Sequence, residues 1–286
     1  MSLVIAYLGP EGTYAETVAL AYERWLTAQG ETVAALQPYP TINATLQAIA
    51  EAQADHAVVP VENSIHGSVA ITLDVLWQLE LPIRQALVLP IQHTLLSHAL
   101  NLAAITTVYS HPQALAQCQG WLESHVPQAQ LVATHSTTAV LRQLIQEPTA
   151  AAIASPRAAA LYQVPTLATS LNDYPENYTR FWIVGREGVS QGNHVALAFS
   201  TPANRPGALV TPLQVFAQRG INLSRIESRP TKRLLGEYLF FIELEGSMTT
   251  AAVQEALAEL PRYTEVLKIF GSYSIWPIRD GAIAAS

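Results

Sequence analysis

A hydroxyl and a guanidinium stand side by side at Thr179-Arg180-Phe181, where a polar loop enters a short apolar run. A guanidinium binds carboxylates through two parallel hydrogen bonds, so this segment could hold an acidic ligand. Arginine is scarce here, because the first 190 residues contain six arginines and no lysine. On residue types alone, a binding site and an ordinary polar loop explain the segment equally well.

A second candidate is the apolar run over residues 57–61, which ends in Glu62-Asn63-Ser64. Asn and Ser favour turns, which is the simpler interpretation of these residues. The end of a buried strand is also where α/β proteins place their ligands, and this position favours a site. Glu62 could act there as a neutral acid or could orient other groups, and both roles stay open.

Ser110-His111-Pro112-Gln113, with Gln117 one turn further on, has the pattern of a helix start. A helix cap explains these residues without any chemistry, although a histidine there could act as a general acid. The hydroxyls of Ser136-Thr137-Thr138 allow the same two interpretations. We keep Ser110 and Gln117 as candidates and interpret His111 as structural.

Charge and cysteine content exclude several classes of protein. Residues 1–190 carry a net charge of −8 and residues 191–286 one of +1, without a basic stripe, which argues against nucleic-acid binding. No His-x-x-x-His pair exists and Cys118 stands alone, so we expect no metal site. A single cysteine fits a reducing compartment such as the cytoplasm. No apolar run reaches the roughly 20 residues of a membrane span, and we expect no export segment.

A repeated pattern indicates the elements that must position these residues. Short apolar runs are followed by Ser or Thr and then by a helical pattern, which predicts mostly parallel sheets covered by helices. The predicted helix starts, at the carboxyl ends of strands, are Thr13, Ser68, Ser110, Ser136 and Ser155. Because the region is poor in basic side chains, backbone N–H groups at helix starts would do much of the binding of an anion.

The order of the elements predicts two lobes and a separate C-terminal unit. Extended segments near residues 83–97 and 166–174 would cross between the lobes, which we place at about 1–80 plus 165–188 and at 82–160. Residues 185–193 are rich in glycine and form the predicted linker. Residues 193–275 then follow a βαββαβ order, which is a ferredoxin-like unit. We expect a loose tail from residue 277 onward.

Five motifs together resemble those of prephenate dehydratases, which have a two-lobed catalytic domain like that of periplasmic binding proteins, followed by a regulatory ACT domain. The resemblance covers about residues 3–275. Its motifs are Gly9-Pro10-Glu11-Gly12-Thr13, Pro60-Val61-Glu62-Asn63-Ser64, Ser110-His111-Pro112-Gln113, Thr179-Arg180-Phe181 and Glu227-Ser228-Arg229-Pro230. The resemblance implies the loss of carbon dioxide and water from prephenate to give phenylpyruvate, in phenylalanine biosynthesis and without a cofactor.

The resemblance also implies roles for the candidate residues. Thr179 would donate a hydrogen bond to the departing hydroxyl, and Arg180 would bind a substrate carboxylate. The remaining catalytic candidates are Glu62, Asn63, Ser110 and Gln117, and the remaining substrate-binding candidates are Thr13, Ser136, Thr137 and Phe181.

For the C-terminal unit, the resemblance implies phenylalanine binding between paired ACT domains, and hence a homodimer or homotetramer. The implicated residues are Gly207, Ala208, Leu209, Asn222, Leu223, Glu227, Ser228, Arg229 and Pro230. From residue types alone, simple packing of helix on sheet explains Gly207 and Gly220 better.

Two alternatives remain. An arogenate dehydratase would perform the same chemistry on the amino analogue of prephenate, and nothing in the sequence separates the two substrates. A non-catalytic, two-lobed amino-acid sensor would share the architecture, although the Thr179-Arg180-Phe181 loop and the missing export signal count against it.

Overall fold

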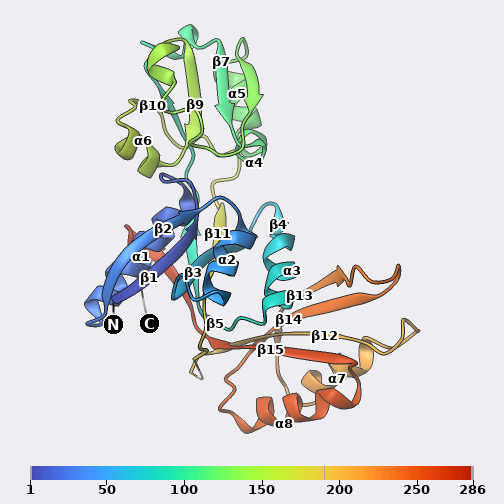
Figure 1. Cartoon of the computed structure of the whole chain (residues 1–286). Coiled ribbons are helices and arrows are strands. Elements are labelled where there is room, and N and C mark those ends of the chain that lie inside the picture. The colour runs from blue at the N-terminus through green and yellow to red at the C-terminus, as the bar shows by residue number, and fades with distance from the viewer. Residues whose placement is uncertain (1, 190, 285–286) are drawn as a thin grey trace.

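The computed structural model describes residues 2–189 and 191–284, which form three sheets in two stacked lobes and a C-terminal unit (Figure 1). This arrangement confirms the predicted fold class, a two-lobed α/β domain followed by a βαββαβ unit. Within the described residues, no helix is long and apolar enough to cross a membrane.

The first lobe contains an eight-stranded sheet in the order β17-β16-β5-β11-β3-β1-β2, with β4 paired to β3. Strand β11 runs antiparallel between β3 and β5, whereas β1 is parallel to both β2 and β3. The strands are β1 Ser2–Leu8, β2 Thr32–Tyr39, β3 His56–Asn63, β4 Gly67–Ser68, β5 Ile83–Pro90, β11 Tyr178–Gly185, β16 Ile275–Arg279 and β17 Ala282–Ile283. The helices are α1 Tyr14–Ala28, α2 Ile42–Ala50 and α3 Ala70–Leu79.

The second lobe contains a five-stranded sheet in the order β10-β6-β9-β7-β8. Its strands are β6 Thr94–Ser97, β7 Thr107–Ser110, β8 Gln130–Ala133, β9 Ala150–Ala154 and β10 Thr166–Ala168. Its helices are α4 Pro112–Gln117, α5 Gln119–His125 and α6 Pro156–Tyr162, with short 3-10 turns at Leu102–Ala104 and Leu144–Gln146. The predicted lobe boundaries were therefore misplaced at both crossings, because β5 belongs to the first sheet and β10 to the second.

Two of the five predicted helix starts are confirmed. Thr13 caps α1 by accepting a hydrogen bond from the Glu16 amide, and Ser155 caps α6 in the same way from Ala158, with Pro156 in the first turn. The proline suits that position because its missing N–H would have no partner there.

The other three serine caps were wrong, because each serine has a different role, although α3 and α4 begin within two residues of Ser68 and Ser110. Ser68 lies in β4 and donates to Glu227, so α3 starts at Ala70 without a side-chain cap. Ser110 ends β7 and donates to the Ile153 carbonyl, which leaves His111 as the cap of α4. Ser136 is followed by turns over residues 137–143 and by no α-helix there.

The C-terminal unit is a four-stranded antiparallel sheet in the order β13-β14-β12-β15. Its strands are β12 His194–Ser200, β13 Leu223–Pro230, β14 Tyr238–Glu245 and β15 Val266–Tyr273, and its helices are α7 Val210–Ala217, α8 Ala251–Glu259 and the 3-10 turn Leu260–Arg262. The two helices pack on one face of the sheet. The other face, with Phe241 and Tyr273, shares a core with Trp182 and Leu73 of the first lobe.

The expected loose tail was wrong. After β15 the chain returns to the first lobe, where β16 pairs in parallel with β5 and β17 pairs with β16 (Figure 1). Trp276 packs against Trp25 of α1 with ring centroids 5.3 Å apart. The apolar run Ile275-Trp276-Pro277-Ile278 explains the docking, because it buries side chains that a free tail would expose to water. In the chain, the C-terminal unit is therefore preceded by β11 and followed by β16, which are both strands of the first lobe.

Candidate active site

A cavity of about 270 Å³ lies between the two lobes. The first lobe contributes the carboxyl ends of β1 and β3, the start of the antiparallel strand β11 and the start of α1, and the second lobe contributes α4 and the loop after β8. It is lined by Leu8, Gly9, Thr13, Tyr14, Ala15, Pro40, Pro60, Asn63, Ile91, His93, His111, Gln113, Ala114, Gln117, His135, Ser136, Thr137, Thr179 and Phe181. This is the position expected for ligands in α/β folds, beyond the carboxyl ends of the strands.

The lobes also touch beside the cavity, through the loop that precedes α1. The Ser155 hydroxyl donates to the Gly12 carbonyl over 2.6 Å, and Arg157 donates to the Glu16 carboxylate. Gly12 has a φ of 84°, and a Cβ atom there would lie 3.1 Å from Cγ2 of Thr138. Only glycine fits this conformation and this close approach without strain, which explains part of the glycine-rich motif.

Seven of the ten catalytic and substrate-binding candidates line the cavity. They are Thr13, Asn63, Gln117, Ser136, Thr137, Thr179 and Phe181. The remaining three, Glu62, Ser110 and Arg180, point elsewhere, and their positions are given below.

Thr179 and Asn63 face each other across β11 and β3. The Asn63 amide nitrogen donates to the Thr179 hydroxyl oxygen over 3.0 Å. Because that oxygen already accepts a hydrogen bond, the hydroxyl hydrogen of Thr179 is left to donate into the cavity, and the bond from Asn63 polarises it.

Asn63 belongs to a ring of three buried carboxamides. Asn63 donates to Asn177 over 2.8 Å, Asn177 donates to Gln117 over 2.9 Å, and Gln117 donates back to Asn63 over 3.2 Å. The Asn63 side-chain oxygen also accepts from the amides of Ile65 and His66, which fixes which way the carboxamide points. The ring connects Asn63 on β3 and Asn177 before β11 to Gln117 on α4. It therefore links the two lobes by hydrogen bonds at the cavity wall.

Four residues at the cavity were not among the predicted site residues: Asn177, His93, His111 and His135. His93 is buried and bonds Gln117 through Nε2 and the Tyr14 hydroxyl through Nδ1. Nδ1 of His111 accepts from the Gln113 amide, so the proton of the neutral ring lies on Nε2. Burial lowers the pKa of both His93 and His111, which favours neutral rings at pH 7. The position of His111 within Ser110-His111-Pro112-Gln113 was the one available sequence signal.

Arg180 and Glu62 occupy the opposite side of the sheet from the cavity. Side chains alternate along a strand, so Arg180 points away from the cleft that Thr179 and Phe181 line. The Arg180 guanidinium lies 2.6 Å from Glu62 and 2.8 Å from Glu243 of β14. The predicted contact of Arg180 with a substrate carboxylate is therefore wrong, and Glu62 does not line the cavity.

Ser110 is 1% exposed and lies behind the cavity wall. Its hydroxyl donates to the Ile153 carbonyl over 2.7 Å and so joins β7 to β9. The structure thus places Ser110 in the support of α4 and not at the cavity surface.

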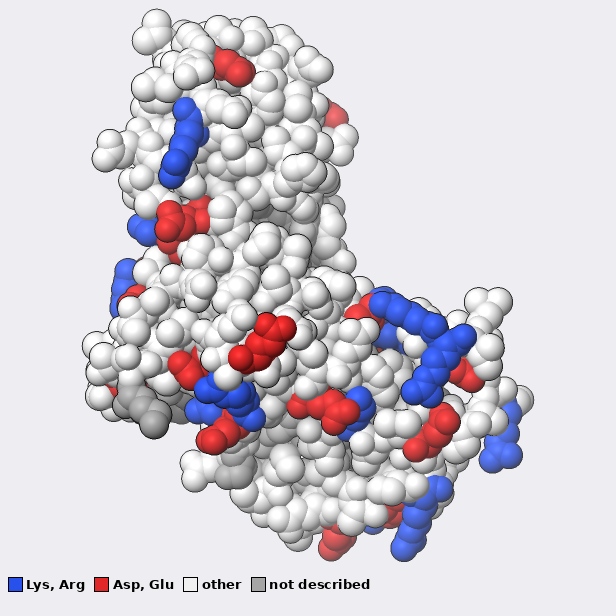
Figure 2. Space-filling view, viewed as in Figure 1, with Lys and Arg blue, Asp and Glu red and all other residues white. Residues whose placement is uncertain are grey.

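The cleft is poor in charge. Among the described residues that line it there is no Lys, Arg, Asp or Glu, and Figure 2 shows few charged side chains over the second lobe. An anion in this cavity would therefore be held by hydroxyl, imidazole and backbone N–H donors. Over residues 2–189 and 191–284, no group of three or more His, Cys, Asp or Glu side chains is arranged to hold a metal ion.

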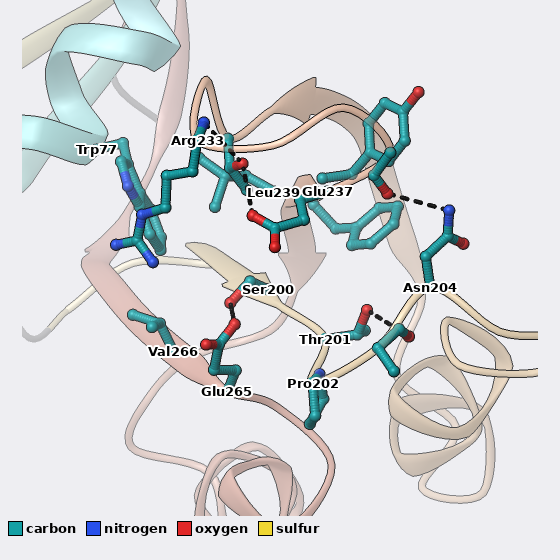
Figure 3. Close-up of a pocket in the computed structure, with 15 residues that line it drawn as sticks. Trp77, Ser200, Thr201, Pro202, Asn204, Arg233, Glu237, Leu239, Glu265 and Val266 are labelled. Atoms are coloured by element: carbon teal, nitrogen blue, oxygen red, sulfur yellow. Dashed lines mark hydrogen bonds between the residues drawn. The ribbon is translucent and has the colours of Figure 1, made fainter.

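A second pocket, of about 150 Å³, lies where the C-terminal sheet meets α3 (Figure 3). Trp77 and Arg233 stand on one side of it, and Ser200 donates to Glu265 on the other. None of the predicted effector residues lines this pocket.

The predicted effector residues lie elsewhere on the C-terminal unit, and two of them contact the first lobe. Glu227 accepts from Ser68, and Arg229 forms two hydrogen bonds to Asp74 of α3. Asn222 and Ser228 are exposed. Gly207 has a φ of 83° and open space around the position of a Cβ.

Comparison with known proteins places the chain in a family. Residues 5–189 match the family model described as prephenate dehydratase, and residues 195–262 match that of the ACT domain. The prephenate dehydratase of Lactococcus lactis subsp. cremoris is 36% identical, with 96% of this chain and 99% of that protein covered.

Two solved structures share the fold of the chain over almost its whole length. The prephenate dehydratase of Arthrobacter aurescens in complex with L-Phe has a TM-score of 0.84 and 34% identity, over 99% of this chain and 92% of that one. GqqA, described as a novel type of quorum quenching acylase, has a TM-score of 0.80 and 27% identity, over 94% and 97%. The family models and the whole-length relatives show that the chain belongs to the prephenate dehydratase family of carbon–oxygen lyases and carries a C-terminal ACT domain.

Proposed function

We propose that the chain converts prephenate into phenylpyruvate, carbon dioxide and water in phenylalanine biosynthesis. The observation that carries this proposal is the Thr179 hydroxyl, whose oxygen accepts from Asn63 so that its hydrogen is free to donate into the interlobe cavity. In the reaction the bond from the ring to the carboxylate breaks, and its electron pair enters the ring. The C4–oxygen bond breaks in turn, and the departing hydroxide takes up one proton from solvent and leaves as water.

Thr179 stabilises the departing oxygen in this scheme. Negative charge develops on that oxygen as its bond to C4 lengthens, and a positioned donor stabilises the developing charge more than it stabilises the substrate. A threonine hydroxyl is a weak acid, so Thr179 donates a hydrogen bond and need not give up its proton. Aromatisation of the ring supplies the driving force.

Neutral donors hold the two substrate carboxylates. We assign this role to the hydroxyls of Thr13, Ser136 and Thr137 and to Nε2–H of His111, all of which line the cavity. Hydrogen bonds to a charged acceptor are stronger than those between neutral groups. Several such donors can therefore bind the carboxylates in a cavity whose described lining contains no Lys or Arg side chain. Asn63 and Gln117 position Thr179 and the cavity wall through the carboxamide ring, and Phe181 supplies an apolar part of that wall.

Phenylalanine binds the ACT domain in this proposal, at a contact between two copies of the chain. Strand β13 lies at the edge of the ACT sheet, and Ile226 on it is 47% exposed. Val210 at the start of α7 is 54% exposed. Unpaired strand edges and exposed apolar side chains favour association, which supports a homodimer or a homotetramer. The single cysteine, Cys118, fits the reducing cytoplasm as the place where the chain works.

The test of the proposal is turnover by the purified full chain. Prephenate is added, and the absorbance of phenylpyruvate in base is followed over time. We expect catalysis on prephenate. A parallel incubation with arogenate is followed by the phenylalanine it forms, because arogenate keeps its amino group, and we expect the rate there to be lower than on prephenate. Binding of prephenate without turnover would contradict the proposal and favour a sensor, and faster turnover of arogenate would favour an arogenate dehydratase.

A further inference from the structure

Arg180 connects the ACT domain to strands β3 and β11, on the face of the sheet that points away from the cavity. On β11 and β3 the pair Thr179 and Asn63 faces the cavity, and the next pair, Arg180 and Glu62, faces the ACT domain. The Arg180 side chain is 12% exposed and holds both Glu62 and Glu243. Any movement of Glu243 relative to β3 must therefore act on the strand pair that carries Thr179 and Asn63.

Glu243 is the acceptor that the side chains at this contact share. Its carboxylate is 3% exposed and accepts from both terminal nitrogens of Arg180, from Arg225 over 3.0 Å and from the Tyr273 hydroxyl over 2.7 Å. A buried carboxylate requires such partners, because an unpaired charge away from water is strongly unfavourable. The geometry of Arg180 is consequently fixed from the ACT side by β13, β14 and β15.

A second contact joins β13 of the ACT domain to the hairpin that follows Asn63. Arg225 donates to the Ser68 hydroxyl over 2.7 Å, and Ser68 donates to Glu227 over 2.7 Å. Ser68 pairs with Glu62 in the β3–β4 hairpin. His66, in the turn of this hairpin, bonds Gln117 of the second lobe. Strand β13 thus contacts the hairpin that joins Asn63 to the carboxamide ring.

We propose that Arg180 is a positioning residue that couples the ACT domain to the Thr179–Asn63 pair through its shared hold on Glu62 and Glu243. The inference rests on the proposed function, and it names the route by which an effector on the ACT domain changes turnover. Arg180 touches no substrate in this account. It fixes the direction in which Thr179 donates, so it acts on kcat more than on KM.

The experiment compares Arg180→Gln, Glu243→Gln and the double variant with the parent, all in the full chain. We expect kcat to fall at least tenfold in each single variant, with KM within threefold of the parent. The double variant should be no slower than the slower single variant, since both remove one coupling. Arg180→Lys, which keeps one charge at this position, should recover part of kcat.

Phenylalanine titrations give a second readout. Allosteric coupling typically changes affinity by about 5- to 150-fold, and the Arg180 and Glu243 variants should lower the parental fold-inhibition toward one. Glu80→Gln is the matched control, because it removes the 2.6 Å ion pair with Lys268 across the same interface without touching β11. This control should keep the parental kcat and the parental inhibition.

The outcomes separate the two proposals. A parent that does not turn over prephenate overturns the proposed function, whereas an active parent whose Arg180 and Glu243 variants keep parental kcat and parental inhibition overturns only the coupling. A lower melting temperature with unchanged kinetics would show a purely structural role and also overturns it. If the charge variants fail to fold, Tyr273→Phe removes one hydrogen bond to Glu243, and it must change the inhibition in the same direction for the inference to stand.

Discussion

Thr179 and Arg180 are consecutive in the chain and serve opposite sides of one sheet. The Thr179 hydroxyl lines the interlobe cavity, while the Arg180 guanidinium is held between Glu62 and the ACT residue Glu243. The alternation of side chains along a strand thus puts a cleft residue and an interdomain ion pair in adjacent positions. The described lining of the cavity therefore offers neutral hydrogen-bond donors, and no guanidinium, to the carboxylates of the substrate.

His111 is expected to contribute to substrate affinity. A hydrogen bond to a charged group is worth about 1.5–3 kcal/mol, so His111→Ala should raise KM roughly 10- to 100-fold with a much smaller change in kcat. His125→Ala is the matched control, because His125 is exposed on α5 and stacks on Trp121 outside the cavity. Steady-state kinetics on prephenate decide the matter, and a KM equal to that of the control would remove His111 from the carboxylate site.

Truncation after Gly188 is expected to destabilise the catalytic lobes. Such a deletion removes β16, which pairs with β5, and the Trp276 ring, which packs on Trp25. It also exposes Trp182, which shares a core with the ACT sheet. We expect the truncated protein to be insoluble or to melt at least 10 °C below the parent in a thermal unfolding experiment. A truncated protein that melted like the parent and turned over would show that the lobes fold alone.

Acid is expected to destabilise the first lobe through His56. Burial lowers the pKa of His56 to about 4, whereas the unfolded chain takes up this proton near pH 6.5. The unfolded state therefore binds more protons between these values, and stability falls as pH drops through this window. The loss from His56 between pH 7 and pH 4.5 is roughly 2–3 kcal/mol.

Urea unfolding of the parent and of His56→Asn at both pH values measures this effect. The variant should lose less stability on acidification than the parent does. Equal losses in the two proteins would show that His56 does not titrate as its burial implies.

The sequence predicted the elements better than the site. Repeated apolar runs and caps such as Thr13 and Ser155 identify βα units locally, because caps act within a single turn. The tail after residue 277 could not be predicted, because a five-residue strand depends on β5, which is distant in sequence. Arg180 was misassigned for a related reason: residue types show that a guanidinium is available, and only the strand register and the ACT sheet determine which carboxylate it meets. Asn177 likewise gains its role only when α4 and β3 come together.

Turnover of prephenate by Thr179→Ala, beside the parent and Thr179→Ser, tests the central claim most directly. Removing one donor to a developing negative oxygen typically lowers turnover about 10²- to 10³-fold. We predict that loss in kcat for Thr179→Ala, with a melting temperature within about 2 °C of the parent, and substantial activity in Thr179→Ser, which keeps the hydroxyl. A Thr179→Ala protein that forms phenylpyruvate within a few-fold of the parental rate would contradict the account.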